Sequence, residues 1–171
     1  MTTVGQPGPE EIRRATPAQQ NAWVIEQFRA NGGALPGEGS PALLLLHHVG
    51  ARTGARRVTP VTFRVDAGRH VIFASYAGGP AHPTWFHNLV AHPRVTYEVG
   101  VETFEARARV VEGEEHKRLW TAQKAEFPVF ADYETSAAPR VIPVVILERD
   151  GPPPCGAPDS TEGRRRQLPP T

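Results

Sequence analysis

Cysteine and long apolar runs are scarce in this sequence, and each scarcity excludes a class of protein. Cys155 is the one cysteine among 171 residues, so neither an intrachain disulfide nor a cysteine metal cluster can form. No run of about 18 apolar residues occurs, which excludes a transmembrane helix. The N-terminal sequence MTTVGQPGPEEIRR lacks the apolar core of a signal peptide. We therefore expect a cytoplasmic protein.

An excess of basic charge is also missing, because 19 Lys and Arg residues stand against 18 Asp and Glu residues. This balance argues against a general nucleic-acid-binding protein. No GxGxxG follows the first expected strand, and no GxSxG surrounds Ser75, which argues against a Rossmann domain and a nucleophile elbow. The 7 histidines include no HExxH pair, and no carboxylate lies between His82 and His92, so we expect no metal site.

The composition divides the chain into four segments. Both ends are rich in Pro, Gly and charge, which predicts disorder there. Between them, the patterns predict one helix followed by one domain. The boundaries are a disordered N-terminus at 1–15, an amphipathic helix at 16–33, the main domain at 34–149 and a disordered tail at 150–171.

The expected first helix has a clear start and a clear end. Thr16 and Gln19 match a capping box, and Pro17 suits the first helical position. Two glycines after Asn31 would stop the helix. Two interpretations stay open for its apolar side chains: docking onto the domain, or peripheral contact with a membrane surface. These side chains are Trp23, Val24, Ile25 and Phe28.

Short β-type segments with tight connections dominate the main domain. Helices are expected at 84–91 and 112–126, and 127–139 is expected to be irregular. Pro60, inside the second strand, implies a bulge or a sheet edge. In a later strand, alternation predicts Phe104, Ala106, Ala108 and Val110 as inward-facing. The fold class is therefore mainly β (α+β), a small barrel of about six to seven antiparallel strands with short helices. The expected strands are 42–49, 58–66, 69–75, 95–99, 102–110 and 141–147.

The central stretch 71–97 offers a candidate site. A strand, a glycine turn, a short helix and another strand would gather Ser75, Tyr76, Trp85 and Asn88 around one concavity. A flat aromatic ring, hydroxyls and an amide suit a planar heterocyclic cofactor. The alternative is a plain hairpin connection in which Trp85 fills the core.

Two further stretches could contribute to binding. The turn GARTGARR, residues 50–57, combines glycines with Arg52, Arg56, Arg57 and Thr53, which could hold an anionic group. The alternative is a solvated basic turn. The aromatic stretch 127–133 could line an apolar pocket or could simply pack in the core.

Four quoted stretches together resemble one known family. They are LLLLHHVGARTGARRVTPV, FASYAGGPAHPTWFHNLVAHPRV, FPVFADY and RVIPVVILE, in order between about residues 40 and 149. In this order and spacing the chain resembles the deazaflavin-dependent nitroreductase family, split β-barrel proteins of actinobacteria that use the reduced deazaflavin coenzyme F-420.

The resemblance implies a split barrel that binds coenzyme F-420 (8-hydroxy-5-deazaflavin). The coenzyme carries a phosphate and an oligoglutamate tail, which arginine can pair with bidentately. The implied coenzyme-binding residues are Arg52, Thr53, Arg57, Val58, Thr59, Pro60, Val61, Thr62, Phe73, Ala74, Ser75, Tyr76, Thr84, Trp85, Phe86, His87 and Asn88.

The resemblance also implies an activity. We expect a reductase that transfers a hydride from reduced coenzyme F-420 to an apolar, electron-poor acceptor: a quinone, an enone or a nitro compound. Ser75 and Tyr133 are the candidate catalytic residues. Family members that reduce nitroimidazoles have a tyrosine cluster of which only Tyr133 stays here, which favours quinones and enones. The implied acceptor-binding residues are Thr62, Phe127, Phe130 and Tyr133.

Two other functions stay open at this stage. One is a non-catalytic carrier of the deazaflavin or of a lipid, and the other is an FMN-dependent oxidase in a similar barrel. The expected partner is a small hydrophobic acceptor, without nucleic acid. A homodimer is one possible assembly.

Overall fold

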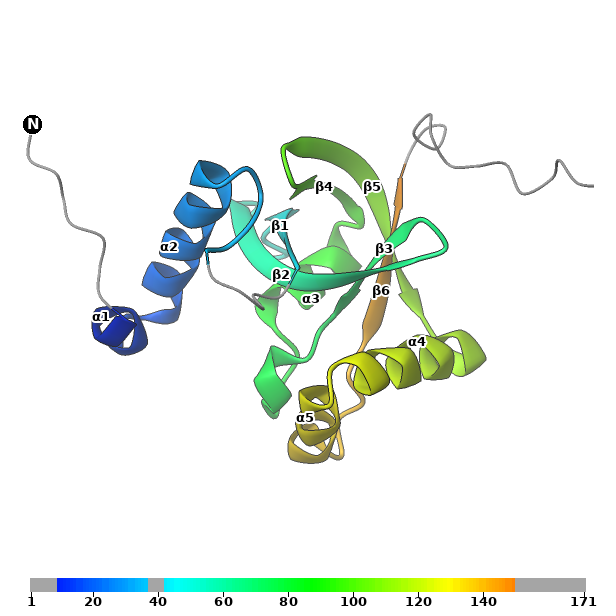
Figure 1. Cartoon of the computed structure of the whole chain (residues 1–171). Helices are drawn as coiled ribbons and strands as arrows, with labels where there is room; N and C mark the ends of the chain where they lie inside the picture. The colour runs from blue at the N-terminus through cyan, green and yellow to red at the C-terminus, as the bar shows by residue number, and fades with distance from the viewer. Residues whose placement is uncertain (1–8, 37–41, 150–171) are drawn as a thin grey trace, which may run out of the picture.

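The computed structural model describes residues 9–36 and 42–149, and the disorder predicted for 150–171 and for residues 1–8 lies outside these ranges. Six antiparallel strands close into a barrel in the order β1-β2-β3-β6-β5-β4 (Figure 1). The predicted fold class is therefore confirmed. The strands are β1 (Leu43–Val49), β2 (Arg56–Asp66), β3 (Arg69–Phe73), β4 (Arg94–Val99), β5 (Glu102–Val111) and β6 (Val144–Arg149).

Strand β1 is buried on both faces, as its unbroken apolar run predicts. Leu44 and Leu46 belong to the core inside the barrel, and Leu45 on the opposite face is also fully buried. His48 follows on the inner face and is only 4% exposed. His48, and not the adjacent His47, therefore faces the barrel interior.

Strand β2 is shared unequally between its two neighbours. Residues 56–62 pair with β1, whereas pairing with β3 covers only Phe63–Asp66. Pro60 pairs with Leu45 and lies where the other edge of β2 has no strand beside it. A residue without an N–H costs no ladder hydrogen bond at such an edge, which confirms the sheet-edge interpretation of Pro60.

Helix α2 (Pro17–Ala30) docks onto the barrel. Thr16 and Gln19 form the predicted capping box. Phe28 is 1% exposed, and the other three apolar side chains of the helix are half-buried. Arg29 forms an ion pair with Glu98 on β4 at 2.6 Å. Because these apolar side chains turn toward the domain, the membrane contact finds no support here.

The remaining helices sit on two sides of the barrel (Figure 1). Helix α3 (Thr84–Ala91) has the predicted bounds and supplies Trp85, Phe86 and Leu89 to the inner core. A second core lies outside the barrel, where α4 (Gly113–Glu126) and α5 (Val129–Ala137) cover β3 and β6. A short 3₁₀ turn, η1 (Tyr76–Gly78), follows β3.

Several local predictions differ from the structure. The N-terminal stretch contains α1 (Pro9–Arg14), whose acidic first turn and basic last turn suit the helix dipole. Residues 127–139 are not irregular, since Pro128 precedes α5, a stretch without Gly or Pro. Strand β6 begins only after Pro143. Val110, predicted to face inward, is 39% exposed near the end of β5.

Candidate functional site

A cavity of about 720 Å³ opens along the free edge of β2, and it is the largest of the three hollows described here. Its walls come from the start of α2, from β2, from the residues after β3, from the start of α3 and from α5. The predicted site residues that line it are Arg57, Thr59, Pro60, Val61, Thr62, Phe73, Ser75, Tyr76, Thr84, Trp85, Phe127, Phe130 and Tyr133.

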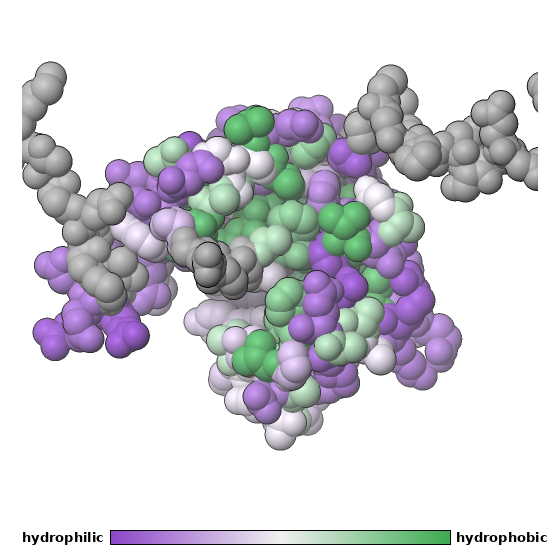
Figure 2. All heavy atoms as spheres, in the orientation of Figure 1, coloured by the Kyte–Doolittle hydropathy of each residue, from purple (hydrophilic) through white to green (hydrophobic). Residues whose placement is uncertain are grey.

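Several lining residues of this cavity did not stand out in the sequence. Pro17, Ala18 and Asn21 belong to α2, the helix that was predicted to lie outside the main domain. Val129 extends the apolar wall and is 45% exposed. Figure 2 shows the molecule in the orientation of Figure 1: the centre of the visible face is mostly apolar, and hydrophilic residues lie mostly at its two sides. The docking of α2 is what adds its first turn to the cavity.

A second cavity of about 480 Å³ adjoins the first and is basic. Arg57 and Thr84 line both. The turn 50–53 and the outer side of α3 form the rest, so the predicted residues Arg52, Thr53, His87 and Asn88 lie here. In the turn, a Cβ on Gly50 would lie 2.6 Å from Oγ1 of Thr53, so any other residue at position 50 would have to displace the Thr53 side chain.

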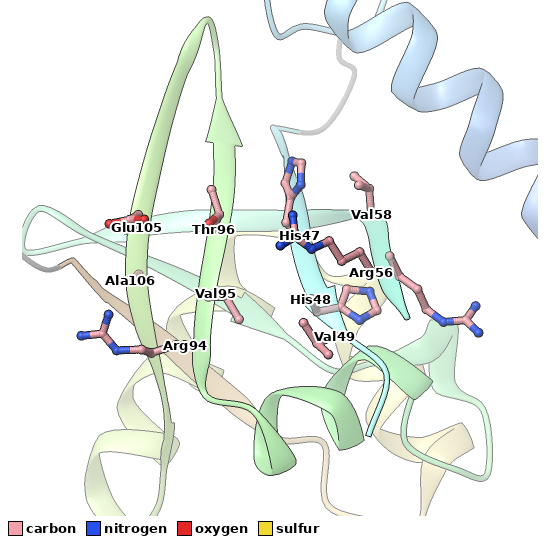
Figure 3. Close-up of a pocket in the computed structure, with 11 residues that line it drawn as sticks. His47, His48, Val49, Arg56, Val58, Arg94, Val95, Thr96, Glu105 and Ala106 are labelled. Carbon is pink, nitrogen blue, oxygen red and sulfur yellow. The ribbon is translucent and has the colours of Figure 1, made fainter. Parts of the chain in front are cut away.

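A third hollow of about 650 Å³ lies where the end of β1 separates from the start of β4. Its side chains come from β1 and β2 on one side and from β4 and β5 on the other (Figure 3). Val58 lines this hollow rather than the first cavity. Arg56, Arg57 and Arg94 make it basic, and Glu105 contributes an acidic group. Arg57 thus stands where all three hollows meet.

Two of the predicted site residues point into the barrel core instead. Ala74 is fully buried, and Phe86 is 9% exposed; both pack in the inner core. Neither lines any of the three hollows described here. Their contribution is to support the neighbours Ser75 and Trp85, which do line the first cavity.

A buried chain of hydrogen bonds connects the basic turn to the first cavity. The Ala51 N–H donates to Oδ1 of Asn88 at 2.9 Å, and Nδ2 of Asn88 donates to Nδ1 of His48 at 2.9 Å. Nε2 of His48 lies 2.9 Å from Oγ1 of Thr59. The polar atoms of Asn88 are therefore engaged in holding the turn, a role that sequence reasoning missed because all its partners are distant in sequence.

His48 is neutral in this chain of hydrogen bonds. Burial, followed by the nearby charges of Arg57 and His47, lowers the pKa of His48 to about 4. With Nδ1 accepting from Asn88, the single ring proton of the neutral form lies on Nε2 and is donated to Thr59. The Thr59 hydroxyl therefore keeps its own hydrogen for a different acceptor.

The aromatic wall divides into core and cavity parts. Phe130 is 7% exposed, and its ring lies 5.9 Å from those of Phe73 and Trp120 in the outer core. The ring of Tyr133 lies 5.3 Å from Phe130 and is only half-buried. Phe127 is also half-buried. Both predicted interpretations of this stretch thus hold in part: Phe130 packs in the core, while Tyr133 borders the cavity.

Comparison with known proteins identifies the family. The model of the F420H(2)-dependent quinone reductase family matches residues 18–149. The chain belongs to this family. It is therefore a reductase that depends on coenzyme F-420, and the resemblance noted in the sequence is confirmed.

Individual relatives of the family agree with this assignment. An F420H(2)-dependent quinone reductase of Mycobacterium tuberculosis is 38% identical over 114 residues, which cover 65% of this chain and 76% of that protein. A solved F420-H2 dependent reductase (FDR-A) has a TM-score of 0.57 and 34% identity, covering 62% of this chain and 93% of that one. A solved domain-swapped dimer has a TM-score of 0.57 and 30% identity, covering 78% and 100%.

The residues present fit the coenzyme of this F-420-dependent reductase. The first cavity offers the flat side chain of Trp85 and the hydroxyls of Ser75 and Thr59, which suit a planar heterocycle with polar edges. Among the described residues, Arg52 and Arg57 have no carboxylate partner, so the adjoining basic cavity is available to an anionic tail. No group of three or more metal-ligating side chains occurs within 9–36 and 42–149.

Proposed function

We propose that the chain binds reduced coenzyme F-420 across the first and second cavities and reduces quinones beside it. The observation that supports this most is the junction at Arg57 and Thr84, where an apolar cavity continues into a basic one. A ligand with a flat ring system and an anionic tail would place its ring in the apolar cavity and its tail in the basic one. When bound, the reduced coenzyme supplies the hydride.

The basic residues act on the tail. Arg57 and Arg52 pair with phosphate or carboxylate oxygens, and Thr53 adds a hydroxyl donor. Asn88 and His48 keep the turn 50–53 in place through their hydrogen bonds to Ala51 and Thr59. By holding the tail, these residues would set how far the ring system reaches into the first cavity.

The polar side chains of the first cavity orient the ring. Ser75 lies two residues after the end of β3 and lines the cavity together with Trp85, which is 7% exposed and packs in the inner core. Thr59 presents a hydroxyl whose lone pair is already engaged by His48. Ser75 and Thr59 therefore hold polar edge atoms, while Trp85 forms a flat wall and excludes water.

Tyr133 and Phe127 define where the acceptor lies. They line the cavity together with Val129. Reduction of a quinone requires one proton for each hydride, and in this proposal the Tyr133 hydroxyl donates that proton to the acceptor oxygen. Solvent then returns the proton to Tyr133, which is half-buried. The largely apolar surroundings favour flat hydrophobic quinones and enones over polar nitro compounds.

Titration with the coenzyme tests this function. Purified protein should bind reduced F-420 and leave its spectrum unchanged until a quinone such as menadione is added, when the reduced spectrum is lost. Binding without turnover on any quinone or enone would contradict the quinone-reductase role and favour a carrier. Tighter binding and turnover with FMN would contradict the choice of cofactor.

The oligomeric state and the cellular location of the protein are further parts of the proposal. A homodimer is compatible with the domain-swapped dimer formed by one solved relative, and sedimentation would test it. No helix within the described residues is long and apolar enough to cross a membrane. The cytoplasmic location predicted from the sequence stays a prediction.

A further inference from the structure

Arg140 lies between α5 and β6, and all its hydrogen-bond donors contact one loop, residues 74–82. Its guanidinium donates to the carbonyl oxygens of Ala74 at 3.1 Å, of Ser75 at 2.9 Å and of Gly79 at 2.8 and 3.1 Å. Nη1 also lies 3.0 Å from Nδ1 of His82. A guanidinium has five N–H groups, and these contacts use every one of them. All the acceptors are neutral.

The loop that Arg140 holds has a backbone that needs external support. Tyr76 and Ala77 have φ angles of 48° and 49°, in the left-handed region that non-glycine residues seldom adopt, and Gly78 follows at 77°. Such conformations persist only where the surroundings enforce them. Two short-range hydrogen bonds stabilise the turn from within: Gly78 N–H to Ser75 O at 3.0 Å and Gly79 N–H to Tyr76 O at 2.9 Å.

This loop forms one wall of the first cavity and packs against α5, which forms another wall. Ser75, Tyr76 and Ala77 line the cavity. A Cβ on Gly78 would lie 3.0 Å from Cα of Tyr133, so the turn packs directly against α5. His82, the last partner of Arg140, stands two residues before Thr84 at the start of α3. Arg140 therefore ties together the two chain segments that carry Ser75 and Trp85.

We propose that Arg140 is a positioning residue for the reaction: by holding the carbonyls of Ala74, Ser75 and Gly79, it fixes Ser75 and Tyr76 in the geometry that the coenzyme requires. This inference rests on the proposed function, since it assumes that the coenzyme ring lies against this loop. Arg140 itself does not line the cavity. Lysine cannot replace it, because one ammonium group has three donors from a single nitrogen and cannot reach four separated acceptors.

The first test compares Arg140→Lys and Arg140→Ala with the wild-type chain before any coenzyme is added. Amide hydrogen exchange at Gly78 and Gly79 reports the turn directly. Both variants should exchange about 10-fold faster or more at these amides, because the turn opens locally when its support is lost. Unchanged exchange at both amides would overturn the inference.

The second test measures coenzyme affinity and turnover of the same variants. Misplacement of positioned groups can cost on the order of 10²-fold, so kcat/KM for the reduced coenzyme should fall about 10- to 100-fold in Arg140→Lys. A lower melting temperature with wild-type kcat/KM and affinity would leave Arg140 as a purely structural residue and overturn the inference.

Guanidinium rescue separates positioning from general destabilisation. Millimolar guanidinium added to Arg140→Ala should restore part of kcat/KM and slow the exchange of Gly78 and Gly79, because the ion presents the same planar donors. Methylammonium at equal concentration should not. Rescue by both cations, or by neither, would count against the planar donor set as the cause.

Arg109→Ala is the matched control. Arg109 makes charged hydrogen bonds to Glu115 and Glu148 that join α4 to the barrel away from the cavity. Its loss should lower stability and leave exchange at Gly78 and kcat/KM as in the wild type. If the wild-type chain itself fails to bind F-420, the proposed function fails, whereas altered turnover in Arg109→Ala alone would contradict the assignment to Arg140.

Discussion

The two ends of the barrel each hold one histidine on the inner face, and the surroundings of these histidines differ. His48, on β1 beside the start of β2, lies in a chain of polar side chains that leads to the cavities. His70, near the end of β2, is enclosed by Phe63, Tyr97 and Phe104, with ring centroids 5.2 to 6.1 Å away. One end is therefore polar and hollow, and the other is plugged by aromatic rings.

The difference shows how one barrel divides stability and function between its ends. At the plugged end Tyr97 is fully buried, its hydroxyl lies 2.9 Å from Nδ1 of His70, and burial raises the pKa of Tyr97 to about 12. Arg149 covers this end, 4.7 Å above the Phe104 ring. At the hollow end the polar groups are held in place by one another, so they stay available to a ligand without an apolar plug.

The plugged end should carry the largest stability effect. Replacing Tyr97 by alanine removes a fully buried ring and should cost about 3–5 kcal/mol of unfolding free energy. Urea denaturation measures this loss. Coenzyme affinity of the folded fraction should stay at the wild-type value, and a large change in affinity would contradict the separation of the two ends.

The hollow end should make stability depend on pH through His48. The pKa of His48 is about 4 in the folded chain and about 6.5 when unfolded. Between these values the unfolded state binds more protons, so His48 contributes stability above pH 6.5 that is lost as the pH falls through 4. The size is on the order of 3 kcal/mol.

His48→Gln isolates this contribution, since a glutamine amide also has one donor and one acceptor side and does not titrate. Unfolding free energies of both proteins are compared from pH 7 to 4. The wild type should lose more stability over this range than the variant. Parallel curves would show that His48 does not titrate as proposed. His70→Gln gives the same comparison at the plugged end, where burial also lowers the pKa of His70.

Two tyrosines, one lining the first cavity and one at the plugged end, test through turnover on quinones whether the two ends have separate roles. Tyr133→Phe should lower the turnover number on quinones about 10²-fold, the range for a lost general acid, while coenzyme affinity stays constant. Tyr97→Phe removes a phenol at the plugged end and should leave turnover unchanged. Steady-state kinetics decide between them, and wild-type turnover in Tyr133→Phe would leave Tyr133 as a packing residue.

Two arginines give the smallest expected effect. Arg57→Ala should weaken coenzyme binding by about 1.5–3 kcal/mol, the range for a hydrogen bond to a charged group. The loss should shrink at high salt, because Arg57 is exposed. Arg149→Ala, at the plugged end, should not alter affinity. Fluorescence titration at low and high salt measures both, and equal affinity of Arg57→Ala and the wild type at low salt would remove Arg57 from the site.

Local signals in the sequence anticipated much of the fold. The capping residues placed the start of α2, and the helix expected at 84–91 has the bounds of α3. Pro60 correctly marked the strand with a free edge. These predictions succeed because each depends on the conformational limits of a few adjacent residues. The stretch after Phe127 was wrongly predicted to be irregular. Pro128 and the absence of Gly and Pro within 129–137 favour a helix, and packing of Phe130 and Ala137 on the outer core stabilises it.

The candidate site was predicted only in part. The resemblance brought forward most of the residues that line the first two cavities. Ala74 and Phe86 turned into the core, because neighbouring residues on a strand or helix face different ways. Arg140 begins one of the stretches that carry the resemblance, but nothing in the sequence indicated its role, since its hydrogen-bond partners lie 58 to 66 residues earlier in the chain.

By itself the sequence determined the antiparallel strands, the family and the basic turn, because these follow from side-chain alternation, turn residues and recognisable motifs. Only the tertiary structure decided that His48 is neutral, that Asn88 holds the turn and that Arg140 supports the loop of Ser75. Each of these depends on burial and on hydrogen bonds between residues far apart in the chain, and those distances are set only when the barrel closes.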